Sequence, residues 1–117
     1  MPDRAQIERF LANLKSTARE GGGWYLAKRN WGFLAGLGLT ETLAKEVVLG
    51  LCVSDCCEGP VGDDNPRERG NVYVFGKEID GTEVYVKLKI AHIGSRRVAK
   101  CLSFHPAERR LHYPFAE

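Results

Sequence analysis

The sequence predicts an α+β domain in which helices from the first half of the chain cover one face of an antiparallel β-sheet formed by the second half. Two patterns lead to this prediction. Apolar residues recur at helical spacing within residues 1–51, whereas apolar and polar residues alternate from residue 71 onward. The length of 117 residues suits one hydrophobic core, so we expect residues 1–117 to fold as a single domain.

The first predicted helix spans residues 2–20. Its apolar side chains recur at intervals of three and four residues, and Pro2 and Asp3 suit the first positions of a helix. The triple glycine at residues 21–23 ends it, because glycine favours helix termini over helix interiors.

Three shorter elements follow. Residues 24–29 (WYLAKR) begin with two aromatic side chains and predict a brief strand. Residues 30–38 (NWGFLAGLG) predict a short helix with Asn30 as its N-cap. A better defined amphipathic helix is expected from about residue 41 to residue 51, with Thr40 as its N-cap.

Residues 54–70 have the composition of a loop. This segment contains two prolines, three glycines and mixed charge, with almost no large apolar side chain. We expect a mobile loop here, and loops of such length within a compact domain are often functional.

Three strands are predicted after this loop, at residues 71–77, 83–92 and 97–104. Asp80 and Gly81 mark a hairpin turn between the first two strands, and the second connection is equally short. Because short connections join neighbouring antiparallel strands, we expect an antiparallel meander.

Strand parity divides the side chains of the predicted sheet between two faces. The face expected to meet the helices has Val84, Val86, Leu88 and Ile90 from the middle strand, with Leu102 and Phe104 from the last. The face expected to be open has Tyr85, Lys87, Lys89, Ser103 and His105. A solvated sheet surface explains such residues without any activity, and a histidine before a proline is commonly structural.

The residues on the open face also suit phosphodiester cleavage in RNA. A histidine with a pKa of about 6.5 can act as general acid or base, so His105 is a candidate catalytic residue. Lys87 and Lys89 suit binding of phosphate, and Tyr85 can donate a hydrogen bond or stack on a base. The basic track along the RNA backbone would be extended by Arg96, Arg97, Arg109 and Arg110.

The distribution of charge agrees with an anionic partner. The net charge is +2, but ten basic and five acidic side chains fall within residues 66–110, whereas residues 54–65 contain four acidic side chains and no basic ones. The strand-forming half is therefore the basic half, where an anionic ligand is expected to bind.

Other site types fit the sequence less well. A zinc site around CVSDCC and His92, His105 or His112 lacks the paired short spacings of structural zinc motifs. The GGG and GLG segments lack the strand context and lysine of a phosphate-binding loop. We therefore expect no metal and no cofactor.

Apolar runs long enough to cross a bilayer are missing from the sequence, and the first ten residues are charged where a secretory signal needs an apolar stretch. We expect a cytoplasmic protein with no membrane partner. The four cysteines are accordingly expected to be free thiols.

The sequence also resembles the MqsR family of type II toxin–antitoxin toxins, over most of the chain from Trp24 to His105. The resemblance depends on the ordered segments WYLAKR, LTETLAKEVVLGL, DCCEGP, VYVFG, GTEVYVKLKI and CLSFH. Members of this family are mRNA-cleaving endoribonucleases with a RelE-like α+β fold. The segment SFHPAERRLHYPF is similar to small toxins of this type in which histidine follows Ser-Phe.

The resemblance implies roles for particular residues. Tyr85 falls at the family's active-site tyrosine, and His105 falls where MqsR itself has a catalytic lysine after Ser-Phe. Two positions depart from the family pattern, because Glu58 stands near the place of a catalytic lysine and Val72 near that of a glutamine. We therefore expect Glu58 and His105 to be the acid–base pair of a metal-independent ribonuclease.

The family likeness further implies two partners, an mRNA substrate and a cognate protein antitoxin that neutralises the toxin in a hetero-oligomer. A rival expectation is a non-catalytic α+β module that binds nucleic acid or a protein through the same basic face. A third is a zinc-stabilised interaction protein.

Overall fold

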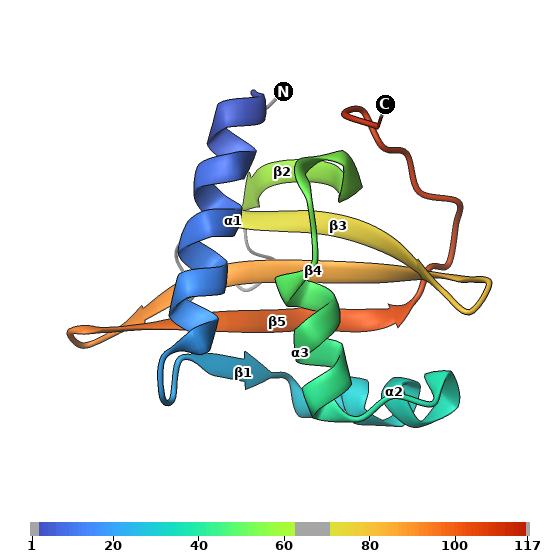
Figure 1. The fold of residues 1–117 in the computed structure, drawn as a ribbon, viewed down its shortest axis with the longest axis horizontal. Helices are drawn as coiled ribbons and strands as arrows, with labels where there is room; N and C mark the ends of the chain where they lie inside the picture. Colours follow the sequence, from blue (N-terminus) through green and yellow to red (C-terminus); the bar gives the residue numbers. More distant parts are fainter. Residues whose placement is uncertain (1–2, 63–70, 117) are drawn as a thin grey trace.

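The computed structural model describes residues 3–62 and 71–116 and confirms the α+β class. Helices α1, α2 and α3 accompany a five-stranded sheet of order β1-β5-β4-β3-β2 (Figure 1). The helices are α1 (Arg4–Arg19), α2 (Trp31–Leu37) and α3 (Glu41–Leu49), with short 3-10 turns at Lys28–Asn30 and Val53–Asp55. The strands are β1 (Trp24–Leu26), β2 (Cys56–Gly62), β3 (Asn71–Ile79), β4 (Thr82–Ile93) and β5 (Arg96–Pro106).

The sheet is mixed, so the prediction of a purely antiparallel sheet is wrong at the β1 edge. Strands β3, β4 and β5 do form the predicted meander. Strand β1, however, pairs in parallel with β5, with Trp24 beside Ala99. A hairpin turn encodes the pairing of adjacent strands, but no local signal encodes the pairing of segments about seventy residues apart.

The predicted loop at residues 54–70 is also wrong in part. Residues 56–62 form β2, which pairs antiparallel with β3, while the predicted loop residues 63–70 lie outside the described ranges. The ladder between β2 and β3 shifts register on both sides of Glu58. Such bulges interrupt the alternation of side chains, and this is why the pattern of a strand is missing from the sequence.

The helices begin and end where side chains satisfy their termini. The carboxylate of Asp3 accepts the backbone N–H of Gln6 at 2.7 Å at the start of α1. The hydroxyl of Thr40 accepts the N–H of Leu43 at 3.1 Å at the start of α3, as predicted. After α1 the chain turns so tightly that a Cβ at Gly23 would clash with the carbonyl oxygen of Thr17.

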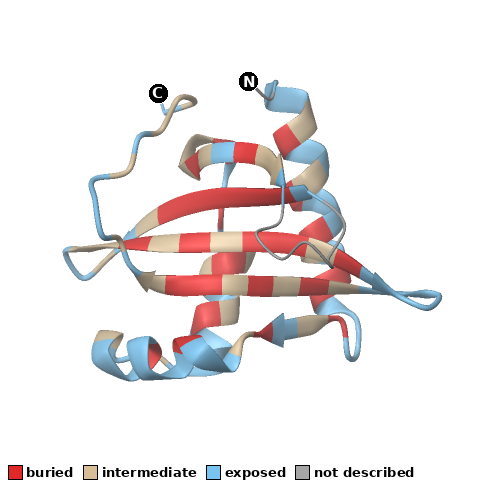
Figure 2. Ribbon diagram, turned by 180° about the vertical axis from the view of Figure 1, so that it is seen from behind, coloured by how far each residue is buried: buried red, intermediate tan, exposed pale blue. Residues whose placement is uncertain are grey.

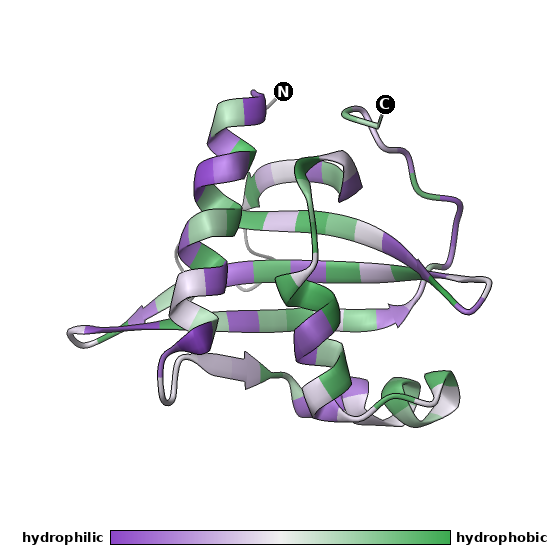
Figure 3. Cartoon of the chain, in the orientation of Figure 1, coloured by the Kyte–Doolittle hydropathy of each residue, from purple (hydrophilic) through white to green (hydrophobic). Residues whose placement is uncertain are grey.

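Helices α1 and α3 lie across one face of the sheet, and α2 lies near its β1 edge (Figure 1). The side chains between these helices and the sheet form the hydrophobic core, which includes Phe75 and Phe104. Phe10 of α1 stacks on Tyr73 with ring centroids 4.0 Å apart. Hydrophobic and hydrophilic residues alternate along β4 (Figure 3), which agrees with one strand face in the core.

Buried and partly exposed residues alternate along much of β4 and β5 (Figure 2), because successive side chains point to the core face and to the opposite face of the sheet. The C-terminal segment after β5 crosses part of this face, since Leu111 and Tyr113 contact the position of Gly76 on β3. In residues 3–62 and 71–116, no helix combines the length and apolar character needed to span a bilayer.

Candidate functional site

Two cross-strand pairs lie at the centre of the candidate site. Tyr85 of β4 stands beside His105 of β5, and Lys87 stands beside Ser103. All four side chains line one cleft, so the prediction that they share a face is confirmed. The rings of Tyr85 and His105 stack with centroids 5.2 Å apart and an interplanar angle of 17°.

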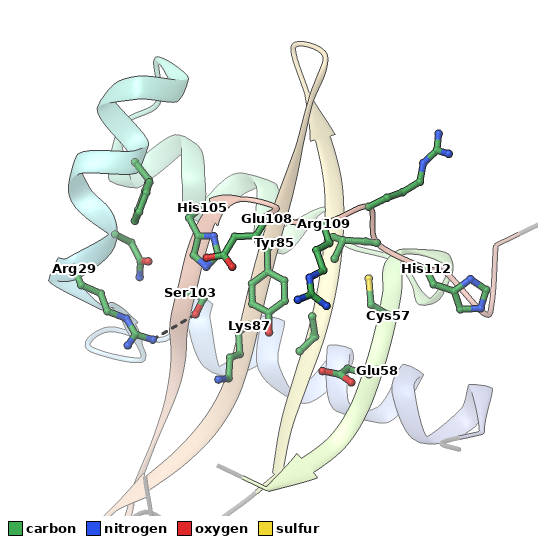
Figure 4. Close-up of a pocket in the computed structure, with 15 residues that line it drawn as sticks. Arg29, Cys57, Glu58, Tyr85, Lys87, Ser103, His105, Glu108, Arg109 and His112 are labelled. Atoms are coloured by element: carbon green, nitrogen blue, oxygen red, sulfur yellow. Dashed lines mark hydrogen bonds between the residues drawn. The ribbon is translucent and has the colours of Figure 1, made fainter. Parts of the chain in front are cut away.

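The cleft has a volume of about 930 Å³ (Figure 4). It is bounded by α2 and the turn before it, by strands β2 to β5, and by the segment after β5. The residues that line it are Arg29, Asn30, Phe33, Cys57, Glu58, Val74, Tyr85, Lys87, Ser103, His105, Glu108, Arg109, Arg110, Leu111 and His112.

A bulge in β5 determines which side chains of this strand reach the cleft. Leu88 pairs with Cys101 and Lys87 pairs with Ser103, so Leu102 is an extra residue. Cys101 and Phe104 are both buried in the core, although simple alternation would place them on opposite faces. The predicted inward pair of Leu102 and Phe104 is therefore wrong for Leu102, which is only half-buried.

The carbonyl oxygen of Leu102 accepts hydrogen bonds from two side chains beyond β1. Arg29 donates to it from Nε at 3.1 Å and from Nη2 at 2.7 Å, and Asn30 donates from Nδ2 at 3.2 Å. The Nη2 of Arg29 also contacts the hydroxyl of Ser103 at 3.4 Å. The bulge thus fixes Arg29 at the border of the cleft.

Asn30 stands at the N-cap position of α2, as predicted, but its side chain makes no capping hydrogen bond to this helix. Its side chain is 1% exposed and continues the ladder that β1 begins on β5. The amide Oδ1 accepts the backbone N–H of Phe104 at 3.1 Å, while Nδ2 donates to Leu102 and to Ala27. Beyond the end of β1, the side-chain amide therefore pairs with β5 as a backbone peptide group would. It supplies the hydrogen-bond partners of the Phe104 N–H and the Leu102 carbonyl oxygen.

His105 has a defined tautomer. Its Nδ1 lies 2.9 Å from the carbonyl oxygen of Pro106, and a carbonyl oxygen only accepts hydrogen bonds. Nδ1 therefore carries a hydrogen in this contact, and Nε2 is the second ring nitrogen. The ring also contacts Phe33 of α2, with centroids 5.4 Å apart, so aromatic rings from two elements hold it in place.

Glu58 and His105 line the same cleft but lie on different sides of it (Figure 4). The register runs from Glu58 to Val74, Lys87 and Ser103 across four strands. Three strand spacings of about 4.8 Å place the backbone of Glu58 about 14 Å from that of Ser103. This arrangement leaves room for a ligand between the carboxylate and the imidazole.

Glu83 anchors the segment that follows β5. Its two carboxylate oxygens accept the N–H of Leu111 and the hydroxyl of Tyr113, both at 2.8 Å. Burial and the hydrogen bond to Glu83 raise the pKa of Tyr113 above its usual range. Arg109 lies just before this anchor and points into the cleft (Figure 4), so the prediction that Arg109 belongs to the site agrees with its position.

Three predicted RNA-binding residues lie elsewhere. Lys89 is 1% exposed, and its neighbours Val72 and Ala91 are buried too, so this part of the face is not an open surface. Parity gives the face of a side chain, but it does not show what covers that face.

Arg96 and Arg97 lie at the far end of β5. Eight residues at about 3.3 Å each separate Arg97 from His105, which gives roughly 26 Å. Arg96 donates to the carbonyl oxygen of Gly21 at 2.8 Å, and Arg97 lies 3.9 Å from the carboxylate of Glu20. They support the turn after α1, and they do not line the cleft.

Sequence patterns missed Arg29, Phe33 and Glu108 as residues of the cleft. Phe33 lies in a short helix of apolar residues and glycine, so the sequence does not distinguish it from a core residue. Only the fold shows that its side chain is 46% exposed. Arg29 and Glu108 lie outside the strands on which parity could be applied.

The four cysteines are free thiols, as predicted. Burial, and to a smaller extent the carboxylate of Glu58, raise the pKa of Cys56 to about 11. Burial raises the pKa of Cys57 and that of Cys101 to about 12. Because the thiolate is the reactive species, these three side chains are poor nucleophiles near neutral pH.

Alkylation is expected to distinguish Cys52 from the other three cysteines. Cys52 is exposed, so iodoacetamide at pH 8 should first add one label per chain. The other thiols should react on the order of 100-fold more slowly than a free cysteine, because little thiolate forms. Mass spectrometry over time measures this, and Cys52→Ser should remove the rapid label. Rapid labelling of several cysteines in folded protein would contradict the expectation.

Within residues 3–62 and 71–116, no three His, Cys, Asp or Glu side chains are grouped so as to hold a metal ion. Comparison with known proteins assigns no family to this chain. No protein-family model matches the chain, and no curated protein or solved structure matches it significantly.

Proposed function

We propose that this protein is a metal-independent endoribonuclease that cleaves single-stranded mRNA and acts as the toxin of a toxin–antitoxin pair. The observation that carries the proposal is the His105–Tyr85 stack, with Nδ1 of His105 bound to the carbonyl oxygen of Pro106, in one cleft with Lys87 and Arg109. An imidazole that can transfer a proton, a phenol that can position a nucleotide and two cations that can stabilise a phosphorane are groups suited to RNA cleavage.

The proposed reaction is an attack of a ribose 2′-hydroxyl on the adjacent phosphate. The Glu58 carboxylate takes the 2′-hydroxyl proton, and the new P–O bond forms a phosphorane whose negative charge Lys87 and Arg109 stabilise. The bond to the 5′-oxygen then breaks, and this oxygen takes a proton from Nε2 of the His105 imidazolium. The products are a 2′,3′-cyclic phosphate and a 5′-hydroxyl, and Tyr85 positions the scissile nucleotide.

The separation of Glu58 and His105 across the cleft supports this division of roles, since a general base and a general acid must act on different oxygens. The resemblance to MqsR toxins supports a RelE-like ancestry of the sheet and a cognate protein antitoxin as partner. We place the activity in the cytoplasm, where mRNA is translated.

Incubation of the purified protein with a mixed-sequence RNA in excess EDTA tests the proposal. We expect cleavage products that end in 2′,3′-cyclic phosphate, which mass spectrometry identifies. A substrate with a single 2′-deoxyribose at the cleaved position should resist cleavage there, because it lacks the nucleophile. Expression in bacteria should stop growth.

Intact RNA under these conditions would contradict the enzymatic proposal. Retained RNA binding without cleavage and without growth arrest would instead favour the rival function, a non-catalytic module that binds RNA through the same cleft.

A further inference from the structure

Phe33 is an exposed aromatic side chain at the border of the cleft. It is 46% exposed, whereas its helix neighbours Leu34 and Asn30 are 3% and 1% exposed. Leu34 and Asn30 therefore provide the contacts that fix α2 to the protein, and much of the Phe33 ring is left to solvent. An apolar ring that lines a polar cleft without joining the core is available to a ligand.

The ring of Phe33 lies directly beside the proposed general acid. Its centroid is 5.4 Å from that of His105, at an interplanar angle of 49°. Because the two rings already touch, a ligand ring cannot enter between them, but it can stack on the solvent side of Phe33. Because His105 is proposed to protonate the 5′-oxygen, a base that stacks on Phe33 would belong to the nucleotide that carries this oxygen.

Arg29 lies four residues before Phe33 and on the same border of the cleft. Its Nε and Nη2 are hydrogen-bonded to Leu102, so the guanidinium is held in one orientation. A flat apolar ring and a positioned guanidinium that line the same cleft suit a nucleotide, with its base on the ring and a phosphate on the cation.

We infer that Phe33 forms a stacking subsite for the nucleobase on the 3′ side of the scissile phosphate, and that Arg29 binds the next phosphate in the 3′ direction. This inference rests on the proposed function, because His105 protonates the 5′-oxygen of that same nucleotide. The base must be unpaired to stack, so the subsite selects single-stranded RNA and excludes duplex RNA.

A cycle that combines a protein variant with a modified substrate tests the subsite. Phe33→Ala is expected to lower kcat/KM by about 5- to 100-fold, the range of base–aromatic stacking. An abasic nucleotide on the 3′ side of the cleavage position should cost the wild-type enzyme a similar factor. On the abasic substrate, Phe33→Ala should then cost less than about twofold, because the stacking partner is already missing.

The same cycle separates base stacking from a role through His105. If Phe33 only positioned the imidazole, Phe33→Ala would slow cleavage of the abasic substrate as much as that of the intact one. That result would overturn the inference while leaving the proposed function in place.

Trp31→Ala is the matched control. Trp31 is 47% exposed on the same helix, but it lies near Lys28 and does not line the cleft. It is expected to change kcat/KM less than twofold. Phe33→Tyr keeps the ring and should keep most of the activity. Phe33→Leu keeps apolar bulk without a ring, so it should fold like the wild type. If its activity is as low as that of Phe33→Ala, the loss comes from the missing ring and not from misfolding.

A binding measurement tests the stacking subsite at Phe33 even if the protein cleaves no RNA. A fluorescent single-stranded RNA with 2′-O-methyl riboses cannot be cleaved, and its affinity follows from fluorescence anisotropy. Phe33→Ala should weaken its binding at least about fivefold relative to Trp31→Ala. Equal affinities of these two variants would overturn the subsite, and equal binding of duplex and single-stranded RNA by the wild type would overturn its selectivity.

Discussion

His105→Ala is expected to lower the rate of RNA cleavage at least about 100-fold, because general acid catalysis typically contributes a factor of 100 or more. The loss should appear mainly in kcat, since the cations and aromatic rings that we propose to bind RNA remain. His105→Asn should be equally inactive. Its amide can still donate to the carbonyl oxygen of Pro106, but it has no group in place of Nε2 that could act as a general acid.

His92→Ala is the control for this experiment. His92 is an exposed histidine on β4, where it pairs with Arg97 at the end of the sheet far from the cleft. Its loss should change the cleavage rate less than twofold. Thermal unfolding of all three variants checks the fold, because His105 stacks on two rings. A His105→Asn variant that is folded and fully active would rule out acid–base catalysis by His105.

Asn30→Ala is expected to lower the free energy of unfolding by about 2 to 4 kcal/mol. The change leaves the buried N–H of Phe104 without its side-chain acceptor, and it removes a donor from two carbonyl oxygens. A buried polar group that loses its partner typically costs 1 to 3 kcal/mol, although such costs do not simply add. Denaturation by urea, followed by circular dichroism, measures the effect.

Asn30→Asp sharpens the test because the aspartate keeps an acceptor for Phe104 and loses only the donor. A carboxylate oxygen would then face the carbonyl oxygens of Ala27 and Leu102, so we expect a loss no smaller than that of Asn30→Ala near neutral pH. Asn13→Ala, at an exposed position of α1, should change stability by less than about 0.5 kcal/mol. A loss below about 1 kcal/mol for both Asn30 variants would contradict the proposed structural role.

The centre of the site was predictable because β4 is regular. Alternation along Val84, Tyr85, Val86 and Lys87 gives the correct face for each residue, and counting back from His105 places Ser103 correctly. Both predictions use local pattern alone, and local pattern is what a strand records in its sequence.

Prediction failed where position depends on segments that are remote in the sequence. Parity placed Lys89 on the correct face, but its burial depends on what covers that face. Arg96 and Arg97 belong to the basic half of the chain, yet the length of β5 separates them from the cleft. The contribution of Phe33 and Arg29 depends on how α2 packs on β5, for which no spacing rule exists.

The segment at Cys56–Gly62 shows a further limit. Its two glycines, its proline and its glutamate have the composition of a loop, but hydrogen bonding to β3 makes it an edge strand. Bulged edge strands tolerate such residues, because they need not alternate and need not donate every N–H. The irregular strand β2 places Glu58 at the cleft, and no alternation of apolar and polar residues around Glu58 predicts this position.

The bulge at Leu102 means that this position matters for its backbone more than for its side chain. A regular β5 would put Ser103 and His105 on the same face as the core residues Ala99 and Cys101, so Ser103 and His105 would not reach the cleft. Among natural variants of this chain, we therefore expect different residue types at position 102, but no insertion or deletion within β5. Loss of the residue would leave the side chains of Arg29 and Asn30 without the carbonyl oxygen that they share.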